Sequence, residues 1–162
     1  MRMKKWLSYL AVPFAVAILV GGIATQTWGG EKGKLRCQGG IVTIKANNLE
    51  VPVKIPHTLV LGQDDGVIFN ETEGAFLDGA RYQLYWVADM TGEDVQFKGY
   101  KVFTMADGSQ VFGKFEGGLS GTWTFIGGTG KYEGVKGSGT YKATALADTV
   151  YWDILEGEYE LP

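Results

Sequence analysis

The sequence predicts an all-β protein, an antiparallel closed β-barrel of about eight strands preceded by an N-terminal signal helix. Three observations favour this fold. From about Gly40 onward, short runs rich in Val, Thr, Phe, Tyr and Trp alternate in polarity, and no helical period interrupts them. Turn dipeptides separate the runs at intervals typical of sandwiches and barrels. Several runs are long and apolar on one face only, and a closed barrel hides the edges that an open sheet would expose.

The chain begins with the features of an export signal. The basic residues MRMKK precede an uncharged run from Trp6 to Ile23, and small residues place a cleavage site after Ala24. This apolar run lies at the shortest length that spans a bilayer, so an uncleaved N-terminal anchor is the alternative. Pro13 and the following small residues favour cleavage. We expect residues 1–24 to direct the protein to the periplasm or the medium, with membrane attachment only where the leader is retained.

The remaining chain has the size of one domain. Residues 25–38 are polar and glycine-rich and are expected to form a tether, and residues 39–162 are expected to form the barrel. Cys37 is the only cysteine, which excludes an internal disulfide. Three of the 15 Lys and Arg residues lie in the leader, against 18 Asp and Glu residues elsewhere, so the mature chain has a net charge of −6. This charge argues against nucleic acid or an anionic membrane surface as a partner.

Turn dipeptides divide the first half of the barrel domain. Asp65-Gly66, Asp78-Gly79 and Thr91-Gly92 favour turns because glycine adopts positive φ at little cost. Between them lie alternating runs rich in β-branched and aromatic residues. In the run 80–90, Tyr82, Leu84, Trp86, Ala88 and Met90 line one side, opposed by Arg81, Gln83 and Asp89. The candidate strands of this half are, in order, 40–46, 51–55, 66–77 and 80–90.

The second half follows the same rules. Asp107-Gly108 separates two runs, and Trp123 and Phe125 alternate with threonines in the run that ends at a glycine pair. The candidate strands of this half are 94–105, 109–117, 119–126, 138–146 and 148–160. The two halves together give nine candidate strands for a barrel that is expected to have about eight.

The stretch GTWTFIGGTGKYEGVKGSGTY, residues 121–141, contains a glycine cluster. A phosphate-binding loop would need a glycine and a Ser or Thr where Phe125 and Tyr132 stand, and the glycine spacing does not fit a dinucleotide fingerprint either. The glycines instead suit a sheet that turns and coils. We expect positive φ at Gly127 and Gly128, and a bulged, coiled return over residues 134–139.

This stretch, together with the ending Glu156-Gly157-Glu158-Tyr159, resembles the barrel shared by allene oxide cyclase-like and dirigent-like proteins. It is most similar to uncharacterised, exported bacterial members of that superfamily. The resemblance implies an eight-stranded antiparallel barrel with a lipophilic cavity. In the plant enzymes the barrel steers cyclisation or coupling of a reactive intermediate, often as a trimer or dimer. The resemblance maps no catalytic position of those enzymes onto this chain.

Two groups of residues are candidates for a site. Aromatic side chains either line a ligand pocket or fill the barrel core. They are Trp86, Phe97, Phe115, Trp123, Tyr141 and Tyr151. A carboxylate held inside an apolar cavity would act as a general acid or base. The candidates are Glu116, Asp153 and Glu156. Asp153 interrupts VYWDIL on the face opposite Trp152 and Ile154, either as an inward polar group or as part of the outer face.

No cofactor or metal is expected. His57 is the only histidine and follows Pro56 without clustered metal ligands, so we interpret it as a loop residue. The leading hypothesis is an exported barrel that binds a small lipophilic molecule. One alternative is a cyclase or isomerase that confines a reactive lipophilic intermediate, and the other is an envelope interaction module that associates with like subunits. The barrel interior discriminates among them: an apolar cavity favours a carrier, a cavity with a buried polar cluster favours an enzyme, and a filled barrel favours the module.

Overall fold

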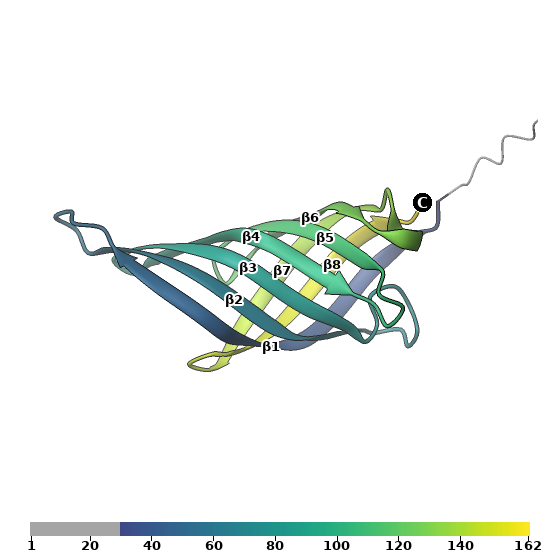
Figure 1. Ribbon diagram of the computed structural model, residues 1–162, viewed down its shortest axis with the longest axis horizontal. Coiled ribbons are helices and arrows are strands. Elements are labelled where there is room, and N and C mark those ends of the chain that lie inside the picture. The colour runs from purple at the N-terminus through teal and green to yellow at the C-terminus, as the bar shows by residue number, and fades with distance from the viewer. Residues whose placement is uncertain (1–29) are drawn as a thin grey trace, which may run out of the picture.

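The computed structural model describes residues 30–162, which form a closed antiparallel β-barrel (Figure 1). The predicted signal segment and the first five residues of the predicted tether lie outside the described residues. Each strand pairs with its neighbours in sequence, and β8 pairs with β1 to close the barrel. The strands are β1 (Lys32–Glu50), β2 (His57–Asn70), β3 (Ala80–Thr91), β4 (Asp94–Thr104), β5 (Gln110–Gly117), β6 (Ser120–Gly128), β7 (Lys136–Ala147) and β8 (Val150–Glu160). The predicted closed antiparallel barrel is confirmed.

Residues 30–162 form eight strands where the sequence suggested nine candidates. The candidate strand 51–55 is instead the loop between β1 and β2, because Pro52 and Pro56 have no N–H to donate to a ladder. β1 begins at Lys32, inside the predicted tether, because Lys32 to Val42 pair with β8. Residues 32–38 are therefore part of the wall.

Asp65-Gly66 is not a turn, which corrects the predicted start of a strand at residue 66. Both residues lie inside β2, which runs on to Asn70. A side-chain carbon on Gly66 would lie 2.9 Å from Cα of Ile41, so the glycine serves the close approach of β1 and β2. The other predicted turn glycines do adopt positive φ: Gly79, Gly92 and Gly108 have φ of 66°, 63° and 82°. These three turns are confirmed.

The glycine cluster forms a corner of the barrel. A short 3-10 helix, η1 (Gly130–Tyr132), joins β6 to β7, and Gly127, Gly130 and Gly134 have positive φ. Gly128 does not have positive φ, contrary to the expectation. It is needed for space instead, because a side-chain carbon there would lie 2.9 Å from the carbonyl oxygen of Gln110. The structural interpretation of this stretch holds.

One half of the barrel interior is filled. The loop between β2 and β3 contributes Phe76 and Leu77, and the connection from β6 to β7 contributes Tyr132 and Val135. Phe76 packs edge-on against Phe125, with ring centroids 5.8 Å apart. Further buried side chains of this half are Leu35, Cys37, Ile68, Phe103, Val111, Trp123 and Leu155. These residues close the interior at the end of the barrel where the C-terminus lies in Figure 1.

The opposite end carries the turns between β1 and β2, β3 and β4, β5 and β6, and β7 and β8. The hairpin of β1 and β2 projects beyond the rest of the wall at this end (Figure 1). Among residues 30–162, no helix has the length and hydropathy needed to cross a membrane. The fold thus gives the barrel one end plugged by side chains and one end at which the interior is reached from outside.

Candidate functional site

The unfilled half of the interior is a cavity of about 410 Å³. Its wall is mainly apolar, and its mouth lies at the end of the barrel that carries the β3–β4, β5–β6 and β7–β8 turns, near Met90, Val95, Leu119 and Thr149. This volume falls within the range of about 300–1,000 Å³ typical of small-molecule sites. A larger hollow of about 660 Å³ lies on the outer wall over β1, β7 and β8, among lysine and glutamate side chains. The enclosed, apolar space inside the barrel is the better candidate for a ligand site.

Most of the aromatic candidates surround this cavity. Trp86 and Phe97 meet edge-on with ring centroids 5.5 Å apart, and Phe115 and Tyr141 do so at 5.6 Å. Tyr151 also lines the cavity. Trp123 does not. It is buried in the filled half, where its indole N–H donates to the carbonyl of Thr140 at 2.9 Å.

The floor of the cavity is a buried polar cluster. Lys101 on β4 and Asp153 on β8 form an ion pair, with Nζ 3.0 Å from Oδ2, and both side chains are almost fully buried. The Tyr82 hydroxyl donates to the same carboxylate oxygen at 2.6 Å and accepts a hydrogen bond from Lys101 Nζ. The ammonium also lies 4.8 Å from the ring centroids of Phe115 and Tyr141, a cation–π geometry. The buried charges of Lys101 and Asp153 are therefore stabilised by contacts with each other, with the Tyr82 hydroxyl and with the aromatic rings.

Burial changes the pKa of the groups in this cluster. It lowers the pKa of Lys101, an effect that the neighbouring Asp153 opposes. Burial, followed by the charge of Asp153, raises the pKa of Tyr82 well above its ordinary value and that of Tyr141 to about 12. Both phenols therefore keep their hydroxyl hydrogens at neutral pH, and that of Tyr82 is donated to Asp153. Tyr141 directs its hydroxyl to the carbonyl of Gly118 at 2.8 Å.

Asp64 is a second carboxylate of the cavity. It lies on β2, is 5% exposed, and its pKa is raised because burial disfavours the charged form. Hydrogen bonding from the indole of Trp86 and the hydroxyl of Thr43 opposes that rise. The contact with Trp86 falls short of good hydrogen-bond geometry, so Asp64 Oδ1 and Trp86 Nε1 are left without a well-formed hydrogen bond in the described part of the chain, as is Asp153 Oδ1.

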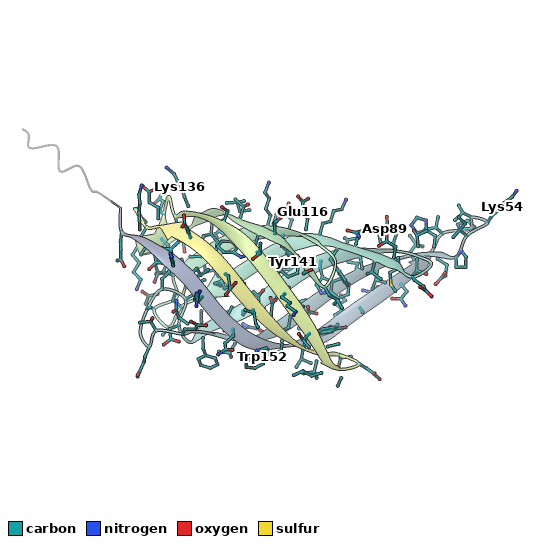
Figure 2. The ribbon with its side chains drawn as sticks, turned by 180° about the vertical axis from the view of Figure 1, so that it is seen from behind. Lys54, Asp89, Glu116, Lys136, Tyr141 and Trp152 are labelled. Atoms are coloured by element: carbon teal, nitrogen blue, oxygen red, sulfur yellow. The ribbon has the colours of Figure 1, made fainter. Side chains whose placement is uncertain are left out.

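The other predicted polar candidates lie elsewhere. Glu116 and Glu156 are exposed on the outer wall, which corrects their place as cavity carboxylates: strand alternation sets each on the face opposite its buried neighbour. Figure 2 shows Glu116 and Trp152 pointing away from the wall. His57 is the first residue of β2 and not a loop residue, and its Nε2 lies 2.7 Å from Asp89 Oδ1. Among residues 30–162, no group of His, Cys, Asp and Glu side chains is arranged to hold a metal ion.

Sequence reasoning missed three of the four polar groups. Lys101 has the same strand parity as Phe97 and Phe103, so a lysine on an apolar face was a usable signal. Asp64 shares its parity with Val60 and Ile68, but the adjoining Asp65-Gly66 suggested a turn. Tyr82 was placed on the correct face without a polar role. Of the carboxylate candidates, only Asp153 lies in the cluster.

Chemically, the arrangement suits a molecule that is apolar over most of its surface. The wall offers aromatic and aliphatic contacts and the carboxyl group of Asp64. The floor offers the ammonium of Lys101 and the carboxylate of Asp153, both hydrogen-bonded to Tyr82. Such groups orient a polar atom of a ligand, or transfer a proton to it, in a space with little water. The lining residues are supplied by all the strands except β6, so the closed barrel sets the positions of the lining groups.

Comparison with solved structures supports the fold. No protein-family model and no curated protein sequence matches the chain. Among solved structures, it is similar to the pterocarpan synthase dirigent protein GePTS1, with a TM-score of 0.55 and 12% identity over 94% of this chain and 97% of that one. It is also similar to the pterocarpan synthase dirigent protein PsPTS1, with a TM-score of 0.51 and 12% identity over 81% of this chain and 96% of that one. At this identity the likeness concerns architecture: the chain has the barrel fold found in these dirigent proteins.

Proposed function

We propose that this protein binds one small lipophilic molecule in the open half of its barrel. The observation that carries the proposal is the mainly apolar cavity of about 410 Å³, closed at one end by the packed half of the interior. Burial of apolar ligand surface supplies the driving force, about 25 cal/mol for each Å² removed from water. A barrel of about eight strands has room for one small molecule inside its wall.

A second candidate function is catalysis, as a cyclase or isomerase that confines a reactive lipophilic intermediate. The buried cluster of Lys101, Tyr82 and Asp153 favours it, because a purely apolar cavity would offer no group for proton transfer. The resemblance of the sequence to allene oxide cyclase-like and dirigent-like proteins supports this candidate, and the solved structures of similar fold are pterocarpan synthase dirigent proteins. Turnover of the bound molecule separates this candidate from simple binding.

The proposed setting is outside the cytoplasm of a bacterium. Its support is the leader, with a basic start, an apolar run and small residues before Ala24. Retention of that leader would leave the barrel tethered to the membrane. The outer wall supports self-association as a further proposal, since Trp152, Ile154 and Phe69 expose apolar surface across the adjacent strands β8, β1 and β2.

A fluorescence titration tests the proposed function. An environment-sensitive lipophilic dye should bind saturably at one molecule per chain and quench or shift tryptophan emission. Trp86→Phe should remove most of the tryptophan response, because Trp86 lines the cavity, while the matched change Trp123→Phe in the filled half should leave the dye affinity unchanged.

Salt provides the control for surface binding. Dye affinity should persist at about 1 M salt, because apolar burial is not screened as surface charge pairing is. Equal responses from the two tryptophan variants, or no saturable binding across a panel of lipophilic dyes, would overturn the proposed function.

A further inference from the structure

Three buried polar atoms along the cavity lack a hydrogen-bond partner in the described part of the chain. They are Oδ1 of Asp64, Nε1 of Trp86 and Oδ1 of Asp153. Buried polar atoms are nearly always hydrogen-bonded, and leaving one unpaired is costly. These three atoms therefore offer hydrogen-bonding positions to a molecule bound in the cavity.

The first two atoms belong to neighbouring side chains. Asp64 and Trp86 lie on the adjacent strands β2 and β3, and the indole is close enough to lower the pKa of the carboxyl. Gly62, which is paired with Trp86 across the two strands, permits this arrangement. The indole ring occupies the space that a side chain at Gly62 would need. The pair therefore presents an acceptor and a donor side by side in the cavity wall.

The charges of the cavity disfavour an anionic ligand. Lys101 is the only cationic side chain among the described lining residues, and it is already engaged by Asp153 and Tyr82. A carboxylate or phosphate group would meet Asp64 and Asp153 with no free cation to receive it. Burying such a charge without a partner is strongly unfavourable.

We propose that the ligand is a neutral lipophilic alcohol whose hydroxyl group binds between Asp64 and Trp86. This inference rests on the proposed function. The hydroxyl hydrogen is donated to Asp64 Oδ1, and the hydroxyl oxygen accepts from Trp86 Nε1. A hydroxyl satisfies both atoms at once, since it is donor and acceptor. An ether oxygen has no hydrogen to donate, an ammonium accepts nothing, and a carboxylate is repelled. The Oδ1 atom of Asp153 is an acceptor for a second hydroxyl deeper in the cavity.

A set of probes of equal chain length tests this selectivity. Decanol, decyl methyl ether, decanoate and decylammonium are titrated by calorimetry into the full-length protein at pH 8, because a high pH promotes the carboxylate form of Asp64. Decanol should bind about ten- to a hundredfold more tightly than the ether or the acid, as expected for a hydrogen bond to a charged group. Decylammonium tests the alternative in which the carboxylate of Asp64 pairs with a cation.

Two adjacent aspartates provide a matched pair of variants. Asp64→Asn should reduce the preference for the alcohol over the ether about tenfold, since a neutral acceptor forms a weaker hydrogen bond, and should improve decanoate binding. Asp65→Asn should leave the order of affinities unchanged, because Asp65 is paired with Arg81 on the outer wall. Trp86→Phe keeps an aromatic ring but removes the donor, and it should lower the alcohol preference independently of the carboxylate.

The outcomes separate the two proposals. Saturable binding of all the probes without preference for the alcohol, or tightest binding of decanoate or decylammonium, overturns the hydroxyl assignment and leaves a lipophilic cavity in place. An alcohol preference that persists in both Asp64→Asn and Trp86→Phe also overturns it. No saturable binding of any probe overturns the proposed function itself.

Discussion

Removal of the buried ammonium is the sharpest perturbation of the cavity floor. Lys101→Met keeps the length and apolar character of the side chain but leaves Asp153 buried with only the Tyr82 hydroxyl as a partner. Both ionic side chains are at most 2% exposed, so solvent cannot replace the lost contact. Breaking one partner of a buried ion pair costs about 3–5 kcal/mol. For a domain of this size, the melting temperature should fall by about 10–20 °C.

The matched comparison replaces the whole cluster. In the triple variant Lys101→Met, Tyr82→Phe and Asp153→Leu, no charge or hydroxyl of the cluster remains unpaired. Apolar replacements of an entire buried ion pair are often neutral or stabilising. The triple variant should therefore be at least about 2 kcal/mol more stable than the single variant.

Urea denaturation at pH 7, followed by far-UV circular dichroism, measures both free energies of unfolding. The m-values report whether the variants unfold as the wild type does. A single variant that loses less than about 1 kcal/mol, or a triple variant no more stable than the single one, would refute the view that the pair is a desolvated and mutually dependent unit.

Other parts of the account predict further results. Asp64→Asn should stabilise the protein at pH 7, because the raised folded-state pKa of Asp64 means that its charged form is destabilising. The gain in the free energy of unfolding should shrink as the pH falls through that raised pKa and vanish below the ordinary pKa of 3.8. Urea titrations at several pH values measure this gain. Gly130→Val should lower stability by about 1–3 kcal/mol because Gly130 has positive φ, and Gly128→Val should destabilise by collision with backbone atoms. Lys131→Ala, a change at an exposed ion pair, should leave the melting temperature nearly unchanged. It should also have no effect on nucleotide binding, because the glycine cluster is not a phosphate-binding loop. Expressed in a bacterium with its leader, the protein should be recovered outside the cytoplasm with Thr25 as its first residue by N-terminal sequencing, whereas a full-length membrane form would identify the leader as an anchor.

The wall of the barrel was predictable because strand alternation is a local property. The same parity that sets Trp152 and Ile154 outward sets Asp153 inward. Glycine was harder to interpret. Turns predicted from the conformational freedom of glycine are correct at Gly79, Gly92 and Gly108. At Gly66, however, glycine is required because β1 approaches closely. That approach depends on which strands pair, and residue 66 by itself does not reveal it.

The polar floor required long-range information. Lys101 and Asp153 are separated by 52 residues and lie on strands that are not adjacent in the sheet, so their contact crosses the interior. Strand tilt and stagger decide which inward residues meet there. The division into a filled and an open half depends similarly on Phe76 and Leu77, which enter the barrel from a loop. Composition alone gives no sign that a loop, and not a strand, fills that end.

The most direct test of the central claim locates a ligand in the barrel. A crystal structure of the protein with a terminally brominated decanol, collected at the bromine absorption edge, marks the apolar end of the molecule. The account predicts one anomalous peak inside the barrel, towards the mouth near Met90 and Leu119, with the hydroxyl between Asp64 and Trp86. An empty interior at saturating probe, or a bromine peak only on the outer wall, would contradict it.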